Sequence, residues 1–151
     1  MPTAEAQLKT FVGKFEPKHQ ALIRATRRWF RKRLPTAHEL VYDNYNFFVI
    51  GYSPTERPSD SVLSIVAGAN GVGVCFIRGK GLPDPEKLLR GSGNQTRSIH
   101  LDRVATLSRP AVLSLIDEAV ARSRAPFAPS GKGTLVIRSI SAKQRPRRRS
   151  S

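Results

Sequence analysis

The sequence contains one cysteine, one tryptophan and only 11 acidic residues, which stand against 26 lysines and arginines. The lone cysteine, Cys75, cannot form a disulfide within the chain, and this favours a reducing compartment. The longest uncharged run, residues 61–77, is interrupted by glycines and is too short to span a membrane. Because residues 1–11 also lack the apolar core of a signal peptide, we expect a cytoplasmic protein.

The chain also lacks the residue spacings that mark metal, cofactor and catalytic sites. Its three histidines are far apart, and none has a histidine or cysteine at the spacing of a metal-binding motif. Gly68, Gly71 and Gly73 match a dinucleotide fingerprint only in part, because no helix and no suitably placed acid follows them. The sequence therefore predicts no catalytic residue, no metal and no cofactor, and it gives an enzymatic function no positive support.

What the chain has in excess is positive charge, with a net value of +15. Residues 122–151 contain nine of the 26 cations and none of the 11 acids, so the charge is concentrated toward the C-terminus. A surplus of this size attracts nucleic acid, other polyanions or acidic proteins. The alternative is a tail that serves solubility and binds polyanions only incidentally.

Apolar periodicity predicts two helices in the first third of the chain, over residues 4–15 and 17–33, with Pro35 ending the second. Residues 40–52 are rich in aromatic and β-branched side chains, which indicates one or two strands. Residues 62–67 and 72–77 flank Asn70-Gly71, and this pair between apolar segments predicts a β-hairpin.

Further along, Asp84 is placed to cap a short helix over residues 85–90, and residues 96–101 are expected to form a strand. Ser108 is expected to cap a helix that has Pro110 in its first turn, and residues 135–140 form a final strand. This order predicts an α+β fold, with a mainly antiparallel sheet covered by N-terminal and C-terminal helices. We divide the chain into a domain over residues 1–124, a linker and added C-terminal strand over 125–142, and a disordered basic tail over 143–151.

A glycine turn surrounded by cations is a candidate anion-binding site, because consecutive backbone N–H groups in such a turn can hold a phosphate or carboxylate. The alternative is a helix end that uses glycine for its conformational freedom. The candidate residues are Lys80, Lys87, Arg90, Gly91, Ser92, Gly93 and Arg97.

Cations three and four residues apart also form a stripe on the expected solvent face of the helix over residues 17–33, and most such stripes are simply solvated. The stripe and the tail together are a candidate basic surface, made of Arg24, Arg27, Arg28, Arg31, Lys32, Lys143, Arg145, Arg147, Arg148 and Arg149. Tyr45 and Tyr52 are candidates for lining a groove, although aromatic residues of a strand more often belong to the core. Cys75 lies in an apolar strand, which indicates a buried, unreactive thiol.

Several segments are similar to a known family. Residues 41–45 (VYDNY), 81–85 (GLPDP) and 91–93 (GSG), with Arg78-Gly79 before the last two and Arg97 after them, resemble the YdhG-like family, domain of unknown function 1801, over about residues 18–121. The resemblance implies a small α+β domain with an antiparallel sheet covered by helices, and a bacterial cytoplasmic context. Some relatives look like frataxin and are described as iron chaperones, and the family has no defined catalytic residues to carry over.

This chain departs from the family in the Ala69-Asn70-Gly71 turn and in lacking the acidic surface of an iron carrier. The leading hypothesis is therefore a non-enzymatic binding module that engages an anionic partner through its basic face and tail. The alternatives are nucleic-acid binding proper, in which the tail arginines contact phosphates, and frataxin-like handling of iron or a small ligand.

Overall fold

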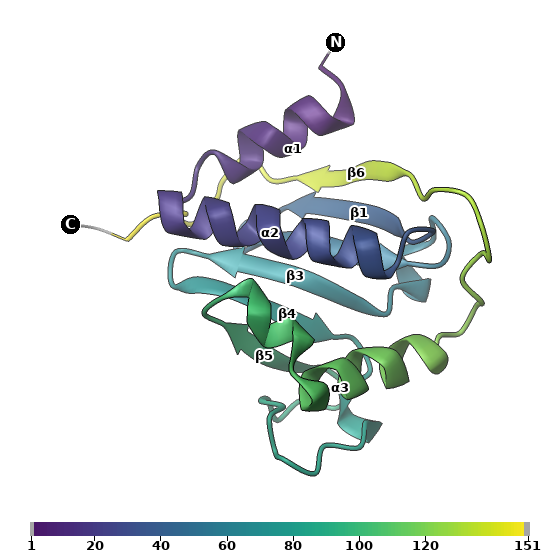
Figure 1. Ribbon diagram of the computed structural model, residues 1–151. Helices are drawn as coiled ribbons and strands as arrows, with labels where there is room; N and C mark the ends of the chain where they lie inside the picture. The colour runs from purple at the N-terminus through teal and green to yellow at the C-terminus, as the bar shows by residue number, and fades with distance from the viewer. Residues whose placement is uncertain (1, 150–151) are drawn as a thin grey trace.

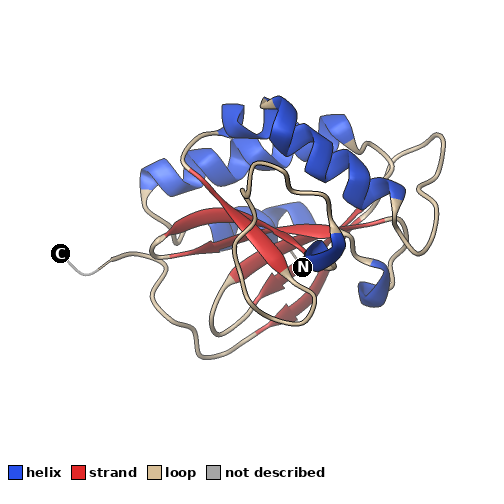
Figure 2. Ribbon diagram, turned by 90° about the horizontal axis from the view of Figure 1, so that it is seen from below, coloured by secondary structure: helices blue, strands red, loops and turns tan. Residues whose placement is uncertain are grey.

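The computed structural model describes residues 2–149 and consists of two layers, a six-stranded β-sheet and three α-helices that lie on one face of it (Figure 1). Seen edge-on, the helices form a layer above the strands, and no α-helix of residues 2–149 lies on the opposite face of the sheet (Figure 2). The elements are α1 (Ala4–Val12), α2 (Pro17–Arg33), β1 (His38–Asp43), β2 (Phe48–Ser53), β3 (Leu63–Gly68), β4 (Gly71–Phe76), β5 (Arg97–Leu101), α3 (Pro110–Ala121) and β6 (Leu135–Ile140), with short 3-10 turns at Pro58–Asp60, Gly79–Gly81 and Val104–Ser108.

The strands follow the order β5-β4-β3-β2-β1-β6. Every neighbouring pair is antiparallel except β1 and β6, which run parallel. The predicted α+β class with a mainly antiparallel sheet is therefore confirmed. The parallel edge arises because the chain crosses from α3 at one side of the sheet to β6 at the other (Figure 1).

The core lies between the helices and the covered face of the sheet. Alternation along β4 directs Val72, Val74 and Phe76 into it, while Gly73 and Cys75 point to the uncovered face, which we call the open face. The ring of Phe30 in α2 packs against the ring of Tyr52 in β2, with 5.0 Å between their centroids. The residues that gave residues 17–33 their helical periodicity are thus the ones that face the sheet.

The hairpin predicted around Asn70-Gly71 is present as β3 and β4, but its turn residues are one position earlier. Gly68 pairs with Gly71, so Ala69 and Asn70 form the two-residue turn. Gly71 closes the turn with a φ of 141°, which a residue with a side chain rarely adopts.

The prediction of a helix over residues 85–90 is wrong, since the segment forms one turn only. The carboxylate of Asp84 accepts hydrogen bonds from the backbone N–H groups of Leu88 and Leu89, four and five residues ahead. Lys87 has a φ of 54°, and a left-handed residue at this point stops a right-handed helix. The predicted cap of α3 is also wrong, because the Ser108 hydroxyl accepts a hydrogen bond from the Trp29 indole and Arg109 is the N-cap residue.

Two candidate surface residues belong instead to a buried polar network. Tyr52 is fully buried, and its hydroxyl donates to Glu39 at 2.8 Å. Burial and the neighbouring Glu39 carboxylate raise the pKa of Tyr52 well above its usual value. Arg27 donates to Glu39 and to Glu5, because α1 covers that side of α2 and brings Glu5 to it. Tyr52 is therefore no groove residue, and Arg27 is no part of a solvent-exposed stripe.

Removing the acceptor of this network tests how much it stabilises the fold. Glu39→Ala leaves the Arg27 guanidinium and the Tyr52 hydroxyl without their buried partner, so we expect a loss of about 3 kcal/mol in the free energy of unfolding. Urea denaturation measures it. Glu118→Ala, which removes a surface pair with Arg122, is the matched control and should cost less than about 1 kcal/mol. Equal losses in the two variants would contradict a special role for Glu39.

Candidate functional site

The end of the chain, residues 141–149, lies against the sheet, and we call these residues the C-terminal segment. The backbone N–H of Ser141 donates to the backbone carbonyl of Asp43 at 2.9 Å, and the backbone N–H of Arg145 donates to the backbone carbonyl of Tyr45 at 2.8 Å. Arg147 is 5% exposed. The prediction of a disordered basic tail is thus corrected for residues 143–149, while residues 150 and 151 lie outside the described residues.

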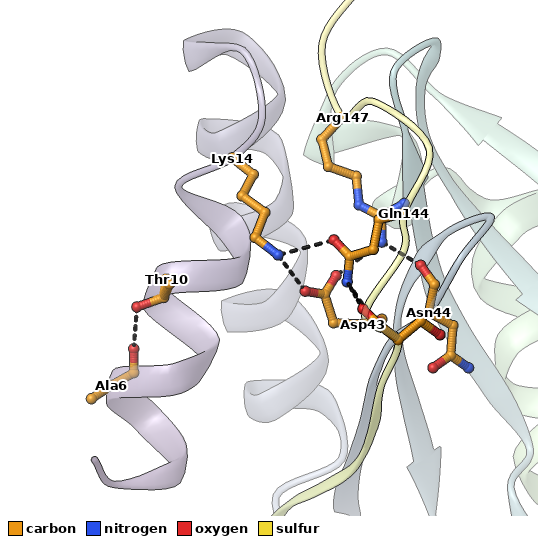
Figure 3. Close-up of polar contacts among 8 residues, drawn as sticks. Ala6, Thr10, Lys14, Asp43, Asn44, Gln144 and Arg147 are labelled. Atoms are coloured by element: carbon orange, nitrogen blue, oxygen red, sulfur yellow. Dashed lines mark hydrogen bonds and ion pairs between the residues drawn. The ribbon is translucent and has the colours of Figure 1, made fainter. Parts of the chain in front are cut away.

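The attachment point is the buried carboxylate of Asp43 at the end of β1 (Figure 3). One oxygen accepts from Lys14 Nζ at 2.7 Å, and the other accepts from Arg147 Nη2 at 2.9 Å. Arg147 Nη2 also donates to the backbone carbonyl of Asn44, and the Gln144 side chain joins Lys14 to the Asp43 backbone. Three parts of the chain that are distant in sequence therefore meet at one carboxylate.

Electrostatics explain why this carboxylate attracts a cation from the far end of the chain. Burial alone would raise the pKa of Asp43, but hydrogen bonds from Lys14, Gln144 and Arg147 outweigh it and hold the pKa below its usual value. A carboxylate that is 0% exposed needs a partner that remains charged, and a guanidinium meets that need. Arg147 thus serves as an anchor and is not available to an external anion.

The anchor places the other arginines of the C-terminal segment beside two exposed aromatic rings. The Arg145 guanidinium lies 5.7 Å from the centroid of the Tyr45 ring, within the range of a cation–π contact. Tyr45 is 49% exposed and Phe47 is 50% exposed, which is unusual for large apolar side chains in a small domain. We call the set Tyr45, Phe47, Arg145, Arg148 and Arg149 the arginine–aromatic surface.

Arg148 and Arg149 are exposed, and each is held by one hydrogen bond. Arg148 Nε donates to the backbone carbonyl of Lys14 at 3.1 Å, and Arg149 Nε donates to the Asn70 side chain at 3.2 Å. Their remaining N–H groups have no hydrogen-bond partner among the described residues. Each guanidinium is therefore positioned by the protein and still has donors for an anion.

The cationic stripe of α2 does not join this surface. Three of its exposed members, Arg28, Arg31 and Lys32, lie toward the C-terminal end of α2, whereas Arg148 contacts Lys14, just before the helix begins. At 1.5 Å per residue, about 20 Å of helix separates the two groups of charges. Arg24 bonds to Gln20 on its own helix. The candidate basic surface of the sequence is thus two separate patches.

The glycine turn predicted to hold an anion lies at the rim of a groove on the open face. The groove has a volume of about 550 Å³, and Arg90, Gly91, Ser92, Gly93 and Arg97 line it. Lys80 and Lys87 are exposed but do not line it. One guanidinium nitrogen of Arg97 donates to the carbonyl oxygens of Gly93 and Thr96, so this cation is already bound by the turn. Arg90 is exposed and is the more available of the two arginines.

Asp43 and Phe47 are site residues that the sequence did not predict. The available signal for Asp43 was an acid within an otherwise apolar and aromatic strand, a position that requires a charged partner. The sequence does not say which of Phe47 and its neighbour Phe48 faces the core. The register of β2 decides it, because successive side chains of a strand point to opposite faces and Phe48 faces the core.

Residues 2–149 were also compared with the requirements of a metal site, a membrane-spanning helix and a reactive thiol. No group of three or more histidine, cysteine, aspartate or glutamate side chains in this part of the chain is arranged to hold a metal ion. None of its helices combines the length and apolar character needed to cross a membrane. Cys75 is half-buried, which differs from the buried thiol expected, because its side chain faces the open side of the sheet. Burial nevertheless raises the pKa of this thiol, which disfavours the reactive thiolate.

Comparisons of the chain with protein-family models, with curated proteins and with solved structures give no match. The resemblance of residues 18–121 to the YdhG-like family stays a prediction.

Substitution of the anchor tests the attachment of the C-terminal segment. Arg147→Ala removes the buried guanidinium, so we expect trypsin to cleave the Lys143–Gln144 bond at least tenfold faster, since a detached segment is open to the protease. Arg149→Ala, which removes an exposed arginine two residues away, is the control and should leave this cleavage rate unchanged. Equal rates in both variants and the wild type would contradict the anchor.

The lowered pKa of Asp43 predicts that acid releases the segment. The ionised carboxylate favours attachment, so its contribution is complete above the ordinary value of 3.8 and is lost as the pH falls through the lower pKa of the folded protein. Hydrogen exchange of the Ser141 and Arg145 amides, corrected for the intrinsic rate, should show loss of protection with a midpoint below pH 3.8. A midpoint above that value would contradict the predicted direction, and Asp43→Asn should abolish the transition.

Proposed function

We propose that the protein is a binding module for an anionic partner, and that the arginine–aromatic surface is its binding site. The observation that carries the proposal is the anchoring of the C-terminal segment by the buried pair of Asp43 and Arg147. Because Arg145, Arg148 and Arg149 are already ordered before an anion binds, binding has a smaller cost in conformational entropy. A solubility tail has no need of a buried attachment.

Nucleic acid is the second candidate, and the two exposed rings favour it. Phosphate recognition alone requires cations, whereas Tyr45 and Phe47 offer flat apolar faces beside those cations. Aromatic side chains interleaved with arginines are typical of surfaces on which bases stack. The α2 stripe adds nothing to this site, because it lies toward the other end of α2.

Handling of iron or of a small ligand has weaker support. The Asp43 carboxylate, the buried acid at this end of the sheet, is occupied by Lys14 and Arg147. A field of arginines repels ferrous and ferric ions. The predicted YdhG-like identity is compatible with a binding module and is part of the proposal only as a description of the fold.

Salt dependence tests the site. With Arg147 buried, three arginines of the surface remain to contact phosphates, so log K for a short DNA duplex should fall with log salt at a slope of about −2.7. Replacing Arg145, Arg148 and Arg149 with glutamine should flatten the slope and abolish binding at physiological salt. Fluorescence anisotropy with a labelled duplex and with labelled polyphosphate measures both quantities.

The matched control replaces Arg28, Arg31 and Lys32 of α2 with glutamine. This variant loses the same charge from a different patch, so its slope and affinity should remain close to those of the wild type. If both variants lose affinity equally, only net charge matters and no defined site exists. If the wild type binds neither anion, the proposed function fails.

A further inference from the structure

Two hollows on the open face meet at the end of the β3–β4 hairpin. One is the groove of about 550 Å³ that reaches from Asn70 across β4 and β5 to Arg90. The other has a volume of about 470 Å³ and is lined by Arg145, Arg148 and Arg149. Phe47, Asn70 and Gly71 line both hollows, so the two form one continuous depression.

Part of the floor of this depression is backbone. Gly71 and Gly73 of β4 have no side chain to fill it, and a Cβ atom at Gly73 would lie 2.8 Å from the carbonyl oxygen of Ile99. The close contact between β4 and β5 therefore requires glycine there. The consequence on the open face is a low point at Gly73, between the two arginine-bearing ends.

Two rings stand where the hollows meet. The Phe47 ring lies over Gly68, with its nearest carbon 3.2 Å from the position of a Cβ atom there. The His100 ring lies over Gly71, with a corresponding distance of 2.9 Å. The Phe47 side chain gains little burial from this position and remains 50% exposed, so it has an apolar face free for another flat group.

The charged side chains that line the depression are all arginines, Arg90 and Arg97 at one end and Arg145, Arg148 and Arg149 at the other. His100 lies between them, and its Nε2 atom is 3.1 Å from the carboxylate of Asp102, which is not part of the lining. No aspartate or glutamate lines either hollow among the described residues. The hollows beside α1 and α2 differ, since Glu5 lines both of them. An occupant that satisfies this lining is a chain with repeated negative charges and planar apolar groups.

We infer that the depression is a track for single-stranded nucleic acid, an inference that rests on the proposed function of the arginine–aromatic surface. Bases stack on Phe47, and phosphates contact Arg145, Arg148 and Arg149 at one end and Arg90 at the other. An unpaired strand exposes both faces of its bases, whereas the bases of a duplex are stacked on each other and cannot reach the rings. Polyphosphate and acidic peptides use the arginines but not the rings.

Ring substitutions separate stacking from charge. Phe47→Ala should weaken binding of a labelled twelve-residue oligothymidine about tenfold, which is within the range for loss of one stacked base. Phe47→Leu keeps apolar contact over Gly68 but has no aromatic face, so it should show a similar loss, while Phe47→Trp should retain the affinity. All three variants should bind polyphosphate as the wild type does.

Arg90 tests the length of the track. Arg90→Gln should weaken oligothymidine binding and reduce the magnitude of the salt slope by about 0.7, the value for one phosphate contact of a single strand. Lys87→Gln, three residues away and not in the groove lining, is the control and should change neither quantity. An Arg90→Gln variant that binds as the wild type does would overturn the track across β4 and β5.

The outcomes for the two proposals differ. Polyphosphate binding that depends on Arg145, Arg148 and Arg149, together with oligothymidine binding that is indifferent to the Phe47 substitutions, would leave the anionic site standing and refute the single-strand track. Stronger binding of a duplex than of the single strand would refute the track as well. Failure to bind any of the anions would refute both.

Discussion

The buried carboxylate of Asp43 is the constraint on which the candidate site depends. An ionised group without access to water needs compensation by cations that remain charged, and Lys14 and Arg147 provide it from opposite ends of the chain. Two nitrogens of Arg147, Nε and Nη1, are buried without an acceptor among residues 2–149, so the interaction fixes position at some cost in stability. The interaction fixes the position of the C-terminal segment, so the arginines of this basic chain end are held in place.

The two faces of the sheet have different roles. The covered face receives α1, α2 and α3 and contains nearly all the large buried side chains, together with the buried Glu39, Arg27 and Tyr52 network at its edge. The open face has glycine, serine and half-buried residues along β3 and β4, with exposed rings at one end. Stability thus depends on one layer of contacts, and the other face is left accessible to a partner.

Local sequence signals predicted the fold wherever neighbouring residues decide the structure. The three- and four-residue spacing of apolar side chains located α2, and alternating apolar runs around the Ala69-Asn70-Gly71 segment located the hairpin. The signals failed where two local rules competed. Asp84 has the chemistry of a helix cap, yet its bonds to Leu88 and Leu89 close a wider turn that Lys87 completes in a left-handed conformation. The parallel pairing of β6 with β1 had no local signal, because strand order depends on the path of the whole chain.

The amino-acid sequence by itself determined the α+β class, the position of most helices and strands, and the excess of arginine toward the C-terminus, since these properties depend on composition and on residues close together in the chain. The tertiary structure alone decided which of those charges are usable. It paired the half-buried Arg27 with Glu39, it buried Arg147 beside Asp43, and it exposed Phe47 while burying Phe48. Whether a side chain lies inside or outside depends on what covers it. The covering groups here come from segments more than ten residues away, and a local pattern contains no information about them.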